Sequence, residues 1–176
     1  APDFTDDALA GVKVGTIECR VAPQYKECTT VPEALNALLA DIKPGDYFAM
    51  NAFLPFDGEG RGQALESVRH AVASFTGVAA CLEIGPRYLH SIGQLQKGGT
   101  NNGVFLIVSA DEPDDITLQQ EVESMGTLAK AQAEGDLVTL AARGRRCVHV
   151  HLPNNAAATL RALSEAVVAA LVARQK

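Results

Sequence analysis

The sequence lacks any apolar run of the length needed to cross a bilayer. Its 176 residues are 47% hydrophobic, but a spanning helix needs about 20 consecutive apolar residues and no run comes near that length. It also lacks a signal-peptide core and the apolar-poor composition that keeps chains disordered. We therefore expect a folded protein with no membrane partner, of a length that suits a single domain.

An excess of basic charge is also missing. The chain has 15 Lys and Arg against 21 Asp and Glu, a formal net charge of -6, whereas a phosphate backbone is bound by a basic surface. Nucleic acid is therefore excluded as a partner. The four cysteines, Cys19, Cys28, Cys81 and Cys147, follow no paired spacing, which is typical of free thiols in a reducing compartment, and we predict a cytoplasmic protein. Because the chain begins with Ala1 and not methionine, we expect further residues upstream.

Short apolar runs alternate with segments of helical periodicity. Runs at 47–54, 78–84, 104–110 and 147–152 predict strands, and helices are expected at 30–42, 63–76, 89–97, 122–134, 137–143 and from Asn154 to the end. Strands that are apolar on both faces and separated by helices form parallel sheets. The sequence thus predicts a three-layer α-β-α sandwich with a mostly parallel sheet over residues 31–176, preceded by an irregular N-terminal arm over residues 1–30.

Ligands of such sheets bind beyond the carboxyl ends of the strands, which indicates three stretches, 55–62, 85–99 and 110–115. The second reads GPRYLHSIGQLQKGG and is the richest in polar side chains. Arg87 and Lys97 are suited to hold an anion, and an imidazole such as that of His90 is suited to move protons. The alternative is a plain turn in which His90 caps a helix.

Residues 85–99, followed by NNGVFL, resemble the C-terminal part of glucose-6-phosphate isomerases. The likeness is greatest to the form fused behind transaldolase in bifunctional bacterial enzymes, which carries GPRFLHSTGQLHKGGP at this point. Three further segments are similar to that family: PGDY at 44–47, AQAEGD at 131–136 and RGRR at 143–146, ending at His151 and Leu152. The likeness covers about residues 43–152.

This resemblance implies a sugar-isomerase domain with a flavodoxin-like sheet. It implies interconversion of glucose 6-phosphate and fructose 6-phosphate through a cis-enediol, with no metal and no organic cofactor. The histidine of LHSxGQ opens the sugar ring in that family, which gives His90 the catalytic role, and we assign substrate binding to Arg87, Ser91, Gln94 and Lys97. Because that histidine often reaches the neighbouring subunit's site, the resemblance also implies a homodimer.

The sequence departs from the family in ways that bear on activity. Gln96 stands where the fused enzymes have histidine, and Thr100 where they have proline. The family's general-base glutamate and phosphate loop lie in its first sugar-isomerase domain, upstream of this segment, and its late lysine has no clear match; we do not transfer that role to Arg161. We therefore expect upstream domains of the same parent chain to complete the site. The alternative is a phosphosugar-binding or assembly module without catalysis.

Other candidates are weaker. Residues 58–62 form a glycine-rich loop, but its acidic neighbours and missing Lys-Ser/Thr ending favour a plain loop. Cys147, His149 and His151 alternate along one strand and so share a face; without a fourth ligand they indicate a half-exposed strand near the sheet edge more than a zinc site. The arginines at 143–146 are either a solvated cluster or a contact for phosphate or another domain. Glu83 is the one carboxylate near His90 in sequence, but the family's base lies elsewhere.

Overall fold

A computed structural model describes residues 10–14, 17–54, 60–112, 115–117 and 124–174. The strands are β1 (Ala10–Val14), β2 (Ile17–Val21), β3 (Tyr47–Phe53), β4 (Ala79–Ile84), β5 (Gly103–Ala110) and β6 (Arg146–Leu152). The helices are α1 (Val31–Ala40), α2 (Arg61–Thr76), α3 (Ile92–Gly98), α4 (Met125–Ala142) and α5 (Ala157–Ala173), with a short 3-10 turn at Pro23–Tyr25. All four apolar runs that predicted strands are strands.

The strands form one sheet in the order β1-β2-β6-β5-β3-β4. The four strands β4, β3, β5 and β6 are parallel to their neighbours, and their order is that of a flavodoxin-like sheet, with the switch in direction between β3 and β5. β5 lies in the middle of the sheet and all its residues are buried, as expected for a strand covered on both faces.

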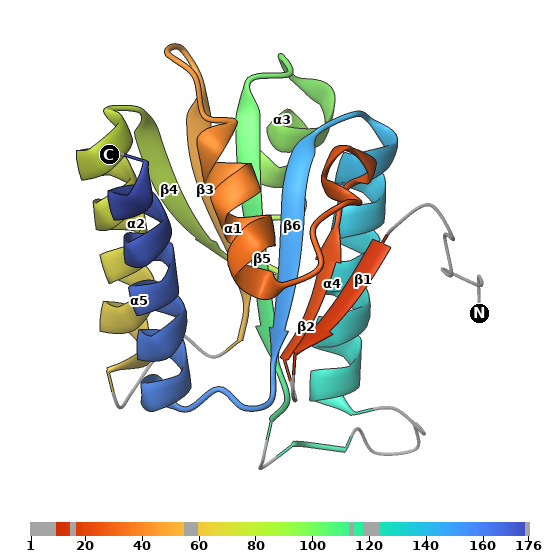
Figure 1. The fold of residues 1–176 in the computed structure, drawn as a ribbon. Helices are drawn as coiled ribbons and strands as arrows, with labels where there is room; N and C mark the ends of the chain where they lie inside the picture. Colours follow the sequence, from red (N-terminus) through yellow and green to blue (C-terminus); the bar gives the residue numbers. More distant parts are fainter. Residues whose placement is uncertain (1–9, 15–16, 55–59, 113–114, 118–123, 175–176) are drawn as a thin grey trace.

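Helices cover both faces of this sheet and complete three layers (Figure 1). α1, α2 and α5 pack together on one face, whereas α4 packs against β5 and β6 from the other face and is joined there by α3. The predicted α-β-α sandwich with a mostly parallel sheet is therefore confirmed. The predicted start of α1 is confirmed too, because the Thr30 side chain accepts a hydrogen bond from the Glu33 amide and Glu33 reciprocates.

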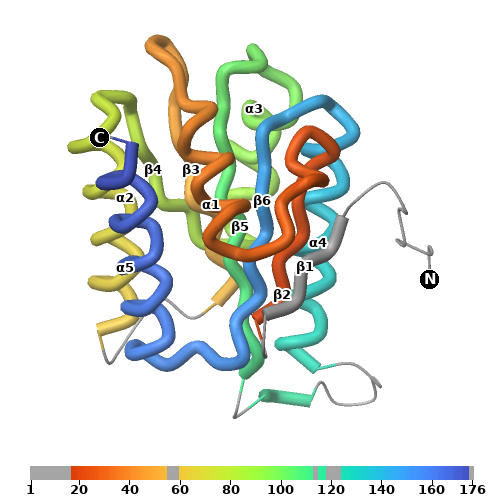
Figure 2. Tube along the Cα trace, viewed as in Figure 1, coloured from red at the N-terminus to blue at the C-terminus, as the bar shows by residue number. Residues whose placement is uncertain are grey.

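Residues 1–30 were expected to be an irregular arm in which 12–21 could be a strand, and where the structure describes that segment it holds two strands. β1 and β2 pair with each other antiparallel. β2 lies beside β6 and continues the sheet antiparallel to it (Figure 2). Cys19 and Val21 on β2 are buried, so this segment belongs to the core. Residues 1–9 lie outside the described residues, as do 55–59, which include part of the glycine-rich loop that the sequence indicated.

The alternating polar residues of β6 indicated a half-exposed strand near the sheet edge, and this prediction is wrong. β6 lies between β5 and β2, and six of its seven residues are buried.

Within the described residues, no helix is long and apolar enough to span a membrane. Cys19, Cys28, Cys81 and Cys147 are all free.

The two helices predicted at 122–134 and 137–143 are one helix, α4, which continues through Gly135. The expected break fell at this glycine, a residue that disfavours helices. Tertiary packing of α4 overrides this local preference: Ala133, Leu137 and Leu140 are buried on either side of the glycine.

Replacing Gly135 with alanine is expected to stabilise the protein by about 0.5–1 kcal/mol. A Cβ at this position meets nothing within 4 Å, so the variant gains helix propensity without a clash. Urea unfolding monitored by circular dichroism measures the effect. Gly85→Ala is the matched control, because its Cβ would lie 2.5 Å from the Phe53 ring; a destabilised Gly135→Ala protein would contradict the continuous helix.

Candidate functional site

The candidate site begins where β4 ends. Gly85 donates its amide to the carbonyl of Ala52 at 2.8 Å and precedes a cis peptide bond to Pro86. A Cβ on Gly85 would lie 2.5 Å from the Phe53 ring, so only glycine lets the chain pass this close to β3. From here the chain leaves the sheet edge and crosses the face that α3 and α4 cover.

Tyr88 fixes the turn that carries His90. Its ring packs edge-on against Phe53, with 5.7 Å between the ring centroids, and its hydroxyl donates to Asp136 Oδ2 at 2.6 Å. Its carbonyl accepts the amides of Ser91 at 3.0 Å and Gly93 at 2.9 Å. A Cβ on Gly93 would lie 3.0 Å from that carbonyl oxygen, which explains physically why a glycine follows the histidine in this segment.

Four of the five predicted site residues lie on one exposed segment. The side chains of Arg87 and His90 are exposed, whereas Ser91 Oγ donates to the Tyr88 carbonyl at 3.2 Å and Gln94 Nε2 donates to the Leu89 carbonyl at 2.8 Å. The structure thus brings these residues together along residues 87–94, with His90 displayed to solvent.

Lys97, the fifth predicted residue, turns the other way. Its Nζ lies 2.5 Å from Asp136 Oδ1, and only 16% of its side chain is exposed. Its neighbour Gln96 is 1% exposed and forms reciprocal hydrogen bonds with Asn51 on β3, at 2.9 and 3.4 Å. Lys97 therefore neutralises a buried carboxylate, and Gln96 ties α3 to the sheet.

Asp136, on α4, is the centre of this buried polar cluster and was not singled out from the sequence. It contacts Tyr88 and Lys97 as described, and Asn51 Nδ2 donates to its Oδ2 at 3.4 Å. Burial and then the negative charge of Asp136 raise the pKa of Tyr88 well above its ordinary value, so Tyr88 remains a hydrogen-bond donor. Buried polar groups are stable when every member is partnered, and here each supplies what its neighbour needs.

Among the arginines at 143–146, Arg143 is exposed, whereas Arg145 and Arg146 turn inward and so do not belong to a solvated cluster. Arg145 is 4% exposed, and its Nη2 donates to the carbonyls of Lys97 and Gly99 at 2.9 and 2.6 Å, where it closes the C-terminal end of α3. Arg146 forms a two-bond pair with Asp46, at 2.7 and 2.9 Å. That pair holds the pKa of Asp46 below its ordinary value.

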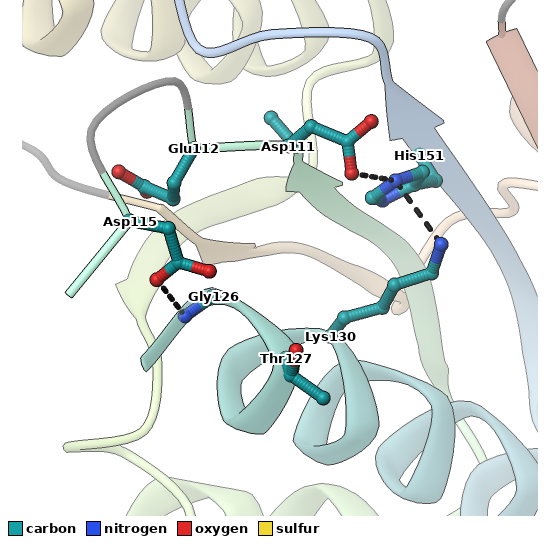
Figure 3. Close-up of a pocket in the computed structure, with 8 residues that line it drawn as sticks. Asp111, Glu112, Asp115, Gly126, Thr127, Lys130 and His151 are labelled. Atoms are coloured by element: carbon teal, nitrogen blue, oxygen red, sulfur yellow. Dashed lines mark hydrogen bonds and ion pairs between the residues drawn. The ribbon is translucent and has the colours of Figure 1, made fainter. Parts of the chain in front are cut away.

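A second polar site lies at the carboxyl ends of β5 and β6 (Figure 3). Its cavity of about 380 Å³ is lined by Ala110, Asp111, Glu112, Asp115, Gly126, Thr127, Lys130 and His151. His151 Nε2 lies 3.0 Å from Asp111 Oδ1 and 3.3 Å from Lys130 Nζ, and Asp115 Oδ1 accepts the amide of Gly126 at 2.7 Å. This site is at the third of the three stretches that the sheet geometry indicated.

The two histidines of β6 are joined below this cavity by Ser109. Ser109 Oγ lies 2.7 Å from His149 Nε2 and 2.8 Å from His151 Nδ1, and His149 Nδ1 has no partner in the described part of the chain. The proton assignment with the lowest energetic cost leaves His149 Nδ1 unprotonated. His149 Nε2 then donates to Ser109 Oγ, Ser109 Oγ donates to His151 Nδ1, and His151 Nε2 donates to Asp111. Burial, followed by the charges of His151, Arg20 and Lys130, lowers the pKa of His149 to about 3.

The described residues contain no group of three or more His, Cys, Asp and Glu side chains that could hold a metal ion. Cys147, His149 and His151 share a face, as their spacing predicted, but all three are buried in the sheet. Ser109, which satisfies both histidines, lies on the neighbouring strand, and nothing in the spacing of 147–151 indicated it. A polar residue ending an otherwise apolar run, as Ser109 does, is the one sequence signal that was available.

Comparisons with known proteins establish the fold and no more. No family model and no curated protein matches the chain. The crystal structure of a hypothetical protein from Thermus thermophilus is similar, with a TM-score of 0.67 and 16% sequence identity. The likeness covers 80% of this chain but only 38% of that protein, so this chain spans well under half of its structural neighbour's length.

Proposed function

We propose that this chain is the C-terminal sugar-isomerase domain of a glucose-6-phosphate isomerase, with His90 as the acid/base that opens the sugar ring. The observation that carries the proposal is that the four segments resembling that family are one another's partners in space. Asp136 of AQAEGD binds Tyr88 and Lys97 of residues 85–99. RGRR binds the end of the same segment through Arg145 and PGDY through Arg146.

The exposed position of His90 suits the reaction proposed for it. Opening the ring breaks the bond between C1 and the ring oxygen, gives a proton to that oxygen and removes one from the C1 hydroxyl. An imidazole serves both transfers near neutral pH. The proton that moves between C1 and C2 needs a second base, which we assign to an upstream domain of the parent chain, together with the phosphate loop. The proposal includes a homodimer and, as the resemblance suggests, a transaldolase fusion.

The proposal is tested on the natural polypeptide that contains this chain, with a coupled assay of fructose 6-phosphate formation. His90→Asn is expected to lower kcat on glucose 6-phosphate by about 100-fold, the ordinary contribution of one acid/base group. His70→Asn is the control, because His70 is an exposed histidine on α2, and it should leave kcat within about twofold. Unchanged turnover by the His90 variant would refute the assignment.

The alternative function is a phosphosugar-binding or assembly module, because the resemblance places the general base and the phosphate loop outside this segment. Lys97 is held by Asp136, which leaves Arg87 as the remaining cation of the predicted anion-binding pair. If the natural polypeptide binds fructose 6-phosphate by calorimetry but does not isomerise it, the binding module is the better description. Loss of this binding in Arg87→Gln would locate the ligand at residues 87–94.

A further inference from the structure

We propose that Asp136 is a positioning residue for His90, which it holds in place through Tyr88 and Lys97. The inference rests on the proposed function, since it concerns the same site. It adds a residue of α4, which does not itself contact the exposed side chains of residues 87–94.

The first set of contacts links Asp136, through Tyr88, to the turn that contains His90. Asp136 Oδ2 accepts the Tyr88 hydroxyl at 2.6 Å, and the Tyr88 carbonyl accepts the amides of Ser91 and Gly93. His90 lies inside the four-residue turn that the bond between Tyr88 and Ser91 closes. Because Tyr88 is 3% exposed and His90 is exposed, the anchored residue is in the core while the turn it fixes is at the surface.

The second set of contacts fixes the C-terminal end of the same segment, at Lys97. Asp136 Oδ1 binds the Lys97 ammonium at 2.5 Å, and Arg145 holds the carbonyl of Lys97 from the other side. One carboxylate therefore fixes both Tyr88 and Lys97, and the exposed residues between them, His90 included, have little freedom to shift. Acid/base groups lose rate steeply when they are misplaced by as little as 1 Å.

Burial makes this link stiff. Only 1% of the Asp136 side chain is exposed, and hydrogen bonds and ion pairs strengthen where water is excluded. An amide in place of the carboxylate keeps the size and one acceptor, but it leaves the Lys97 charge without its counter-ion. Asp136→Asn therefore loosens the segment. Tyr88→Phe removes only the hydrogen bond from the Tyr88 hydroxyl to Asp136 and keeps the ring against Phe53.

The test measures ring opening directly in the natural polypeptide. The probe is the anomerisation of glucose 6-phosphate, followed by exchange NMR, because this reaction opens the ring without moving the C2 proton. Asp136→Asn and Tyr88→Phe are expected to lower its rate by about 10- to 100-fold with KM changed less than about threefold. Glu134→Gln, on the same helix but at a partly exposed ion pair with Arg20, should leave the rate unchanged.

The double variant His90→Asn/Asp136→Asn separates positioning from general damage. If Asp136 acts through His90, the double variant is no slower than His90→Asn alone. If Asp136 only supports the fold, its loss multiplies with that of His90→Asn, and the inference is overturned. It is also overturned if Asp136→Asn and Tyr88→Phe keep the full rate while His90→Asn does not. No loss in His90→Asn itself refutes the proposed function instead.

Discussion

Between pH 6.5 and pH 4 the free energy of unfolding of the wild type is expected to fall by about 3 kcal/mol more than that of His149→Gln, or by about 1.4 kcal/mol for each pH unit. In the folded protein the pKa of His149 is lowered to about 3, whereas a histidine in the unfolded chain takes up a proton near pH 6.5. Below pH 6.5 the unfolded state therefore binds the additional proton, and the free energy of unfolding falls until the pH approaches 3.

Urea unfolding of the wild type and His149→Gln at pH 7, 6, 5 and 4 measures this effect. The glutamine amide can still bond to Ser109, so the variant differs mainly in having no group to protonate. Carboxylates that titrate over the same range are common to both proteins and cancel in the difference. A difference in the free energy of unfolding that is the same at pH 7 and pH 4 would show that His149 is not held neutral by burial.

Replacing Arg145 with methionine is expected to lower the free energy of unfolding by about 3 kcal/mol. The guanidinium is 4% exposed and donates to two part-buried carbonyls at the end of α3, so its loss removes both of these charge-assisted hydrogen bonds. Methionine keeps most of the side-chain length, which limits the cavity.

Arg143→Met is the matched control for this prediction. Arg143 lies two positions away and is exposed, and its bond to the Lys97 carbonyl is long, at 3.4 Å, so we expect a change within about 0.5 kcal/mol. Hydrogen exchange adds a local measure, because the α3 amides should lose protection in the Arg145 variant alone. Equal effects of the two substitutions would contradict the difference in burial.

The parallel core was predictable because its strands are continuous apolar runs. β3 to β6 fall where the sequence placed them, and α1 begins within the range expected for it. β1 and β2 were not predictable in this way, because their apolar residues are mixed with charged ones such as Lys13 and Arg20. Such a segment becomes a strand when a sheet edge, here β6, is available to pair with it.

The polar residues were harder to read than the apolar ones. His90 is exposed on the segment where it was expected, but sequence spacing did not show that Lys97 and Arg145 face inward. A charged side chain is ordinarily at the surface, and only the three-dimensional partner reverses that preference. Asp136 on α4 binds Tyr88 and Lys97, and Ser109 on β5 bonds to His149 and His151. Both residues are far from these partners in sequence.

The pairing of β2 with β6 has a consequence for the order of folding. Glu18 lies opposite His151, so β2, which can pair early with β1, joins the rest of the sheet only when β6, the last strand of the sheet along the chain, has been made. Until then the open side of β2 is available to other strands, and contacts between such distant parts of a chain form slowly. We expect the sheet to assemble from β3, β4 and β5 outward, with the N-terminal hairpin joining once β6 is in place.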